Sequence, residues 1–146
     1  ILDLLQRDAA LSVAEIAERV GLSATPCWRR IRNLEKTGVI RRRVALLDRE
    51  RLGLGVTVYV AVRTREHSAA WLDTFADAVR ALPEVLELHR MSGDIDYLLK
   101  VVVADIAAYD AFYKRLIERV PLSDVSSSFA MEEIKSTTAL PLPAPD

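Results

Sequence analysis

Two helix starts lie close together near the beginning of the chain, and their spacing limits what this part can fold into. Residues 12–15 read Ser-Val-Ala-Glu, a capping box in which the serine and glutamate side chains satisfy each other's backbone amides. Gly21 suits the left-handed position that ends a helix, and Ser23 suits the N-cap of the next one. Pro26 falls in the first turn of that second helix, where its missing N–H is harmless. Two helices joined by so short a turn predict a helix-turn-helix.

The second of these helices has one apolar and one polar stripe. Its apolar side chains follow the i, i+4, i+7 spacing of a face turned toward a core, and they are Cys27, Ile31 and Leu34. The polar stripe consists of Thr25, Trp28, Arg29 and Arg32, with Arg30 next to it. A helix face with arginines suits the major groove, where a guanidinium can bind a guanine edge or a phosphate. Trp28 keeps two interpretations, a DNA contact or packing against the preceding helix, whereas Cys27 is interpreted as a small buried hydrophobe.

The net charge of −1 conceals two unlike halves. Residues 1–52 hold 11 Lys+Arg and 7 Asp+Glu, whereas residues 53–146 hold 9 and 14. Within residues 23–43 the only acidic side chain is Glu35, against seven basic ones that include Arg41, Arg42 and Arg43. This concentration favours a polyanion partner, here double-stranded DNA, with the three consecutive arginines on its phosphates. A solvated helix face would have the same composition.

The second half of the chain shows strand and helix patterns in a defined order. These patterns predict strands at 56–62, 85–91, 97–103 and 125–131, and helices at 69–81 and 105–120. The order β-α-β-β-α-β is that of the ferredoxin-like arrangement. The chain is therefore predicted to be an α+β protein, with an N-terminal helix-turn-helix domain followed by a ferredoxin-like βαββαβ domain.

The predicted strand at 97–103 is apolar on both of its faces, apart from Lys100. Both helices of a ferredoxin-like domain cover the same face of the sheet, so the other face needs a different partner. We expect a second copy of the same sheet, because Leu98 and Val102 would otherwise be exposed there. A two-fold dimer would present two recognition helices to half-sites about 34 Å apart, or a multiple of that distance.

The loop from Met91 to Tyr97 is the part of the second half that has the chemistry of a binding site. Gly93 allows a close approach of backbone to a ligand, and Asp94 or Asp96 can bind an ammonium group while backbone amides bind a carboxylate. Together these groups suit the two ends of an amino acid. The alternative interpretation is a hairpin turn with solvated acids.

Several runs of the sequence resemble the Lrp/AsnC (feast/famine) transcription regulators. In the first half they are Val13-Ala14-Glu15-Ile16-Ala17, Val20-Gly21-Leu22-Ser23, Cys27-Trp28-Arg29-Arg30-Ile31 and Leu34-Glu35-Lys36-Thr37-Gly38-Val39-Ile40. In the second half Gly93-Asp94-Ile95-Asp96-Tyr97 is similar to the Gly-x-x-Asp-(Tyr/Phe) motif of the family's effector-binding domain, and residues 134–142 are similar to its C-terminal segment. The resemblance extends from residue 1 to about 142.

The resemblance implies a DNA-binding regulator whose assembly or DNA affinity responds to an amino acid bound near subunit interfaces. It makes Met91, Gly93, Asp94, Asp96 and Tyr97 the candidate effector-binding residues. Residues 27–30 and 126–133 further resemble a branch linked to cysteine sensing and detoxification, so cysteine is the first candidate effector. We expect a DNA-binding domain at 1–46, a linker at 47–54 and a ligand-binding and oligomerisation domain at 55–142. Homodimers are expected to assemble further into tetramers or octamers.

Two other functions are compatible with this architecture. Sirohaem decarboxylases share it, but they would need basic and histidine side chains for a polycarboxylate tetrapyrrole, and the second half is acidic with only His67 and His89. A nucleoid-organising protein would bind DNA without effector control. We expect no catalytic residue, cofactor or metal site. No membrane span is expected, because no apolar run is long enough to cross a bilayer. A cytoplasmic location is expected, because Cys27 is the only cysteine. Because helical spacing is present from Ile1 on, we also expect the natural chain to begin earlier.

Overall fold

The computed structural model describes residues 1–143, which fall into two compact units. The first unit joins Ile1–Leu47 to the segment that starts at Ile134, and the second unit is Asp48–Glu133. This division differs from the expected one, because the tail from Ile134 lies in the first unit and not with the ferredoxin-like domain. Part of the expected linker is a turn of the second unit, in which the Leu54 amide donates to the Arg49 carbonyl at 2.8 Å.

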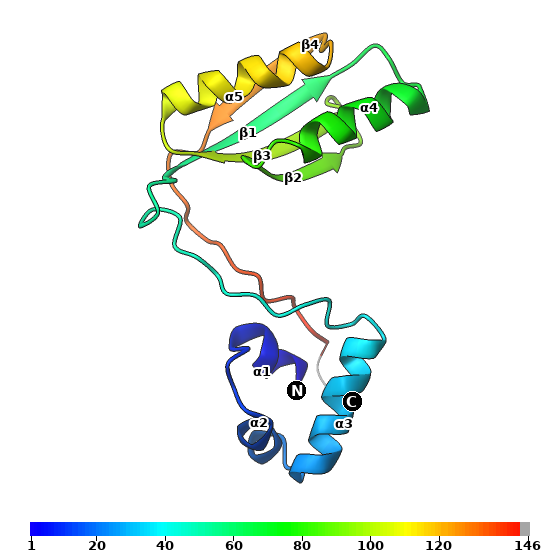
Figure 1. Ribbon diagram of the computed structural model, residues 1–146, viewed down its shortest axis with the longest axis vertical. Helices are drawn as coiled ribbons and strands as arrows, with labels where there is room; N and C mark the ends of the chain where they lie inside the picture. Colours follow the sequence, from blue (N-terminus) through cyan, green and yellow to red (C-terminus); the bar gives the residue numbers. More distant parts are fainter. Residues whose placement is uncertain (144–146) are drawn as a thin grey trace. The chain divides into compact units, whose positions relative to one another are not determined.

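The described residues of the first unit form three helices, α1 (Leu2–Arg7), α2 (Val13–Arg19) and α3 (Ala24–Lys36) (Figure 1). The predicted capping box of α2 is present, with both of its reciprocal hydrogen bonds. Gly21 has a φ of 68°, and the Leu22 amide donates to the Ala17 carbonyl at 2.9 Å, which satisfies a carbonyl at the end of α2. Ser23 is the N-cap of α3 as predicted, but its hydroxyl makes no capping hydrogen bond.

A small apolar core holds the three helices together. Its buried members come from every helix, and they are Leu5, Ile16, Ala17, Cys27 and Ile31. Of the predicted apolar stripe of the second helix, Cys27 and Ile31 are buried in this core, whereas Leu34 is only partly buried. Cys27 is the small hydrophobe that its place in the pattern indicated. The core fixes which face of α3 remains available to solvent.

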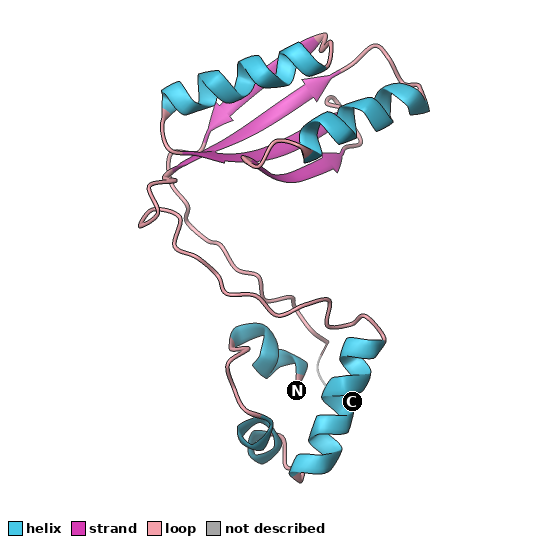
Figure 2. Ribbon diagram, in the orientation of Figure 1, coloured by secondary structure: helices cyan, strands magenta, loops and turns pink. Residues whose placement is uncertain are grey.

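The second unit is a four-stranded antiparallel sheet with two helices. Its elements in chain order are β1 (Val56–Arg63), α4 (Ala69–Arg80), β2 (Val85–Arg90), β3 (Tyr97–Val103), α5 (Ile106–Arg119) and β4 (Asp124–Phe129). The strand order is β2-β3-β1-β4, and both helices lie on the same face of the sheet (Figures 1 and 2). The predicted ferredoxin-like arrangement is confirmed. Among residues 1–143, no helix has the length and apolar character that crossing a membrane requires.

The core of the second unit lies between the sheet and its helices. Alternate residues of the two central strands point into it, namely Val58, Val60 and Val62 of β1 and Leu99, Val101 and Val103 of β3. Phe75 of α4 and Phe112 of α5 are fully buried against them. The side chains that alternate with these residues along β1 and β3 point to the other face of the sheet, which we call the bare face. Because β2 and β3 are neighbouring antiparallel strands, the loop between them lies at one end of the sheet.

Candidate nucleic-acid interface and effector loop

The outward face of α3 carries the predicted polar stripe. Trp28 is 52% exposed, and Thr25, Arg29, Arg30 and Arg32 are exposed as well. This exposure favours the first interpretation of Trp28, with its ring available to a partner. The Arg32 guanidinium carbon lies 6.0 Å from the centroid of the Trp28 ring, within reach of a cation–π contact. The arrangement is suited to entering a groove with an aromatic ring and several cations on one face.

Arg41, Arg42 and Arg43 follow α3 in an extended segment, and all three are exposed. Arg43 pairs with Glu35 of α3, with 3.1 Å between Nη2 and Oε1. The same carboxylate pairs with Arg32, with 3.1 Å between Nη1 and Oε2. The structure therefore connects the two basic groups that the sequence indicated, the polar stripe and the arginine run, through a single acidic residue.

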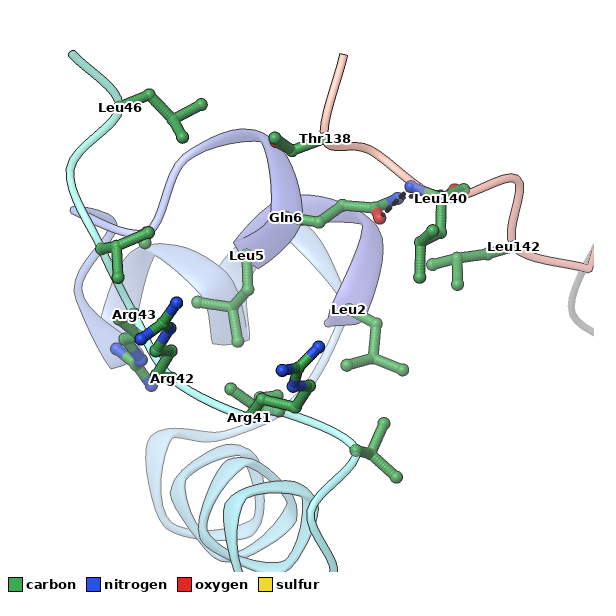
Figure 3. Close-up of a pocket in the computed structure, with 14 residues that line it drawn as sticks. Leu2, Leu5, Gln6, Arg41, Arg42, Arg43, Leu46, Thr138, Leu140 and Leu142 are labelled. Carbon is green, nitrogen blue, oxygen red and sulfur yellow. Dashed lines mark hydrogen bonds between the residues drawn. The ribbon is translucent and has the colours of Figure 1, made fainter. Parts of the chain in front are cut away.

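A cavity of about 370 Å³ lies within the first unit, beside the arginine run (Figure 3). Apolar side chains of α1, among them Leu2 and Leu5, line it together with Leu140 of the tail. The tail is held there by Gln6, whose amide accepts from the Leu140 N–H at 2.8 Å and donates to the Leu140 carbonyl at 3.2 Å. Because both backbone groups of one residue bind one side chain, this pair fixes the tail against α1.

The loop between β2 and β3 exposes only some of the predicted effector-binding residues. Met91, Gly93 and Asp94 are exposed, and Gly93 has a φ of 112°, a conformation that favours glycine. The Asp94 carbonyl accepts from Nε of Arg63 at 2.6 Å. Among residues 1–143 the Asp94 carboxylate has no ion-pair partner within 4.0 Å, and so it is available to a cation.

Asp96 and Tyr97 have structural contacts that the sequence analysis did not anticipate. Asp96 Oδ2 accepts from the Thr64 amide at 2.8 Å, and so this carboxylate ties the loop to the end of β1. Tyr97 is only 6% exposed, and its ring lies 5.1 Å from that of Phe75 and 5.8 Å from that of Trp71. Tyr97 is therefore a core residue, and its ring is not offered to a ligand at the loop surface.

The bare face is less apolar than predicted. Glu87 of β2 pairs with His89 at 3.0 Å and with Lys100 of β3 at 3.5 Å. The hydrogen bond with His89 is the largest influence on the pKa of Glu87, which lies below its ordinary value; partial burial opposes this effect, and the Lys100 ammonium adds to it. The predicted apolar strand thus faces an ionic cluster on this side, because the neighbouring strand contributes charged residues.

One end of the bare face is covered by the chain itself. The Arg49 guanidinium donates to the Thr57 hydroxyl and pairs with Glu133 at 3.5 Å. Val102, which is in register with Thr57, is only 7% exposed. Leu98 lies further along β3 and is half-buried. Of the two residues expected to need a second copy, only Leu98 remains accessible enough for that role.

Sequence reasoning missed the residues that support these sites. Arg63 and Thr64 follow from the topology, because antiparallel pairing sets Val62 opposite Tyr97 and so brings the end of β1 to the loop. Glu35 is visible in the sequence as the only acidic residue of its segment. Gln6 has no sequence signal, since its partner Leu140 is 134 residues away.

Comparison with known families divides the chain into two matched parts. Residues 1–41 match the winged helix-turn-helix DNA-binding model, and residues 57–140 match the Lrp/AsnC ligand binding domain. The chain is 52% identical over 143 residues to the DNA-binding transcriptional activator DecR of Escherichia coli, covering 97% of this chain and 94% of that protein.

Solved structures with the same architecture extend this comparison. A crystal structure of an AsnC family transcriptional regulator from Agrobacterium tumefaciens has 61% identity and a TM-score of 0.94, covering 96% of this chain and 92% of that one. A transcriptional regulator from Neisseria meningitidis in complex with L-Met has 38% identity and a TM-score of 0.91, covering 96% and 91%.

Fold and relatives together define a DNA-binding transcription regulator, and not an enzyme, in which a helix-turn-helix precedes a ligand-binding domain. More particularly, the chain belongs to the Lrp/AsnC family of transcriptional regulators.

Proposed function

We propose that this regulator changes its DNA affinity or its assembly when a small amino acid binds at the loop between β2 and β3. The observation that carries the proposal is the exposed Asp94 carboxylate beside Gly93, which offers an anion and an accessible backbone within one turn. An amino acid carries opposite charges a few ångströms apart, so it needs both kinds of group. Asp96 is a second candidate for the ammonium, through the oxygen that does not bind the Thr64 amide.

Cysteine is the first candidate effector, on the resemblance of residues 27–30 and 126–133 to the cysteine-linked branch. Methionine is a second candidate, because the Neisseria relative is in complex with L-Met. Both have a sulfur-containing side chain, and like any amino acid they carry the ammonium and carboxylate that the loop can bind. Within the loop, Met91 is exposed and can contact an apolar side chain of the ligand.

The outward stripe of α3 is the proposed DNA-reading surface. Its support is the joint exposure of Thr25, Trp28 and the three arginines of the helix, in a unit whose core holds the opposite face. The run Arg41–Arg43 is proposed to bind phosphates, which supply affinity without sequence information. In this proposal the first unit binds DNA and the second unit binds the effector.

We propose that two copies associate through the bare face of the sheet. Leu98 and the 42%-exposed Tyr59 provide apolar area on this face, away from the end that Arg49 covers. A two-fold dimer would bind a pseudo-palindromic site, and dimers would then build tetramers or octamers.

A thermal-shift screen of the twenty amino acids tests the sensing proposal. A ligand present at about 100 times its dissociation constant should stabilise a one-site protein by roughly 2.7 kcal/mol. The screen is paired with a gel shift of duplex DNA with and without each stabilising amino acid. A response to none of them would refute effector control and leave a DNA-organising protein of shallow sequence preference.

A further inference from the structure

Glu35 occupies an unexpected place for an acidic residue, since it lies on the helix proposed to bind a polyanion. Its two carboxylate oxygens bind different partners. Oε2 accepts from Nη1 of Arg32 and Oε1 accepts from Nη2 of Arg43, each at 3.1 Å. Arg32 belongs to α3, and Arg43 belongs to the extended segment that follows. One carboxylate therefore connects the recognition helix to the arginine run.

Arg32 lies near both an aromatic ring and a carboxylate. Its guanidinium lies 6.0 Å from the centroid of the exposed Trp28 ring, and its ion pair with Glu35 is on the same helix three residues further on. A long arginine side chain otherwise samples many rotamers, and a bidentate bond to a guanine edge requires one defined orientation of the planar group. The ring and the carboxylate together favour one orientation of the 65%-exposed Arg32 side chain before DNA binds.

Electrostatics alone predicts that Glu35 weakens DNA binding. A carboxylate among seven basic residues repels phosphates and neutralises part of the field that attracts the duplex. This repulsion acts on every sequence equally, whereas a fixed Arg32 favours only the sequences that match it. A residue with both effects lowers overall affinity and raises discrimination between sequences.

We propose that Glu35 is a specificity-determining positioning residue, which orients Arg32 and Arg43 for DNA at the expense of overall affinity. The proposal rests on the DNA-reading surface proposed above for α3. Glu35 acts through the arginines, without a contact of its own to the bases.

The experiment compares one selected duplex with a shuffled duplex of the same composition. The full wild-type chain first selects the duplex from a randomised library, and dissociation constants are then measured for both duplexes. The test variant is Glu35→Gln, which keeps the side-chain length and removes the charge. The matched control is Glu18→Gln, which removes one charge from an exposed position of α2 that makes no ion pair among the described residues.

Glu35→Gln should bind the shuffled duplex several-fold more tightly than wild type, because a repulsive charge is gone. It should not bind the selected duplex more tightly, so the ratio of the two affinities falls by about tenfold, within the range expected for one misplaced bidentate contact. Glu18→Gln should leave that ratio unchanged. In an Arg32→Ala background, Glu35→Gln should change the ratio much less, because the residue it positions is gone.

Three results would overturn the proposal. Equal tightening on both duplexes would show that Glu35 acts only as a charge. The same loss of ratio in Glu18→Gln would show that the ion pairs do not position a reading residue. Failure of the wild-type chain to select any sequence would refute the DNA-reading surface itself, and is distinguished from the other two because it is observed before any variant is made.

Discussion

Replacing Asp96 separates its structural contact from its proposed contact with a ligand. The Asp96 carboxylate accepts from the Thr64 amide at 2.8 Å, and Thr64 is only 8% exposed. Asp96→Ala would leave this amide without an acceptor in a place that water reaches poorly. An unsatisfied buried donor costs about 1–3 kcal/mol. For a unit of the size of Asp48–Glu133 this corresponds to a decrease in Tm of roughly 5–20 °C.

Asp96→Asn is the matched variant, because its amide oxygen still accepts from Thr64 while the negative charge is removed. We expect it to retain most of the stability, with a loss below about 1 kcal/mol. If Asp96 binds the ammonium of the effector, the ligand-induced rise in Tm should be lost in Asp96→Asn as well as in Asp96→Ala. The assay is thermal unfolding followed by circular dichroism, with and without cysteine and methionine.

Asp94→Asn completes the set, since the Asp94 carboxylate is exposed and supports no such backbone contact. Loss of the ligand response in this variant alone would identify Asp94 as the ammonium partner. Retention of the full response in both asparagine variants would place the sensing site elsewhere. An Asp96→Ala protein that unfolds at the wild-type temperature would refute the hydrogen-bond argument, whatever the ligand does.

Three further predictions follow from the other surfaces. Arg29→Ala should weaken binding to the selected duplex by about 1–3 kcal/mol if Arg29 contacts a base. Arg41→Ala should weaken binding to all duplexes alike and reduce the slope of log affinity against log salt concentration by about 0.9. Gel shifts that respond to neither change would refute the proposed surface. Leu98→Asp should produce monomers or aggregates by placing an unpaired carboxylate in the sheet interface, and light scattering that finds the wild-type chain monomeric at micromolar concentration would contradict this interface. Hydrogen bonds from the Ser12 hydroxyl and amide hold the pKa of Glu15 below its ordinary value of 4.5. The contribution of ionised Glu15 to the stability of the first unit is therefore complete above about pH 4.5 and is lost as the pH falls through the lowered pKa. Glu15→Gln should therefore flatten the decline in urea midpoint of the first unit below that pH, and an identical decline in both proteins would rule out this capping contribution.

Local sequence patterns predicted the helices and strands because each residue involved interacts with residues close to it in the sequence. Ser12 and Gly21 limit α2 through contacts within six residues, and the alternation of Val58, Val60 and Val62 requires only one buried sheet face. The same alternation places Tyr97 in register with Val62 on the core side. The burial of Tyr97 therefore follows from the alternation of inward and outward side chains along β3, when that alternation is extended to the last residue of the loop motif.

Other features depend on residues that meet only after folding. Gln6 and Leu140 lie at opposite ends of the chain, and nothing in the composition of either end pairs them. The ionic cluster of Glu87 and Lys100 needs the register of β2 against β3, which a bulge between Val85 and Glu87 shifts. Patterns of hydrophobicity do not contain such shifts, and so the bare face was expected to be more apolar than it is.

The first unit combines residues that precede the second unit in the sequence with residues that follow it, and this arrangement sets the order in which its parts are synthesised. The three helices leave the ribosome before the second unit, but Leu140, which Gln6 binds, is synthesised only after the whole second unit. At about 5–20 residues per second the helices wait for several seconds without their tail. A product that terminates before Leu140 therefore contains the three helices and their core without the hydrogen bonds between Gln6 and the tail.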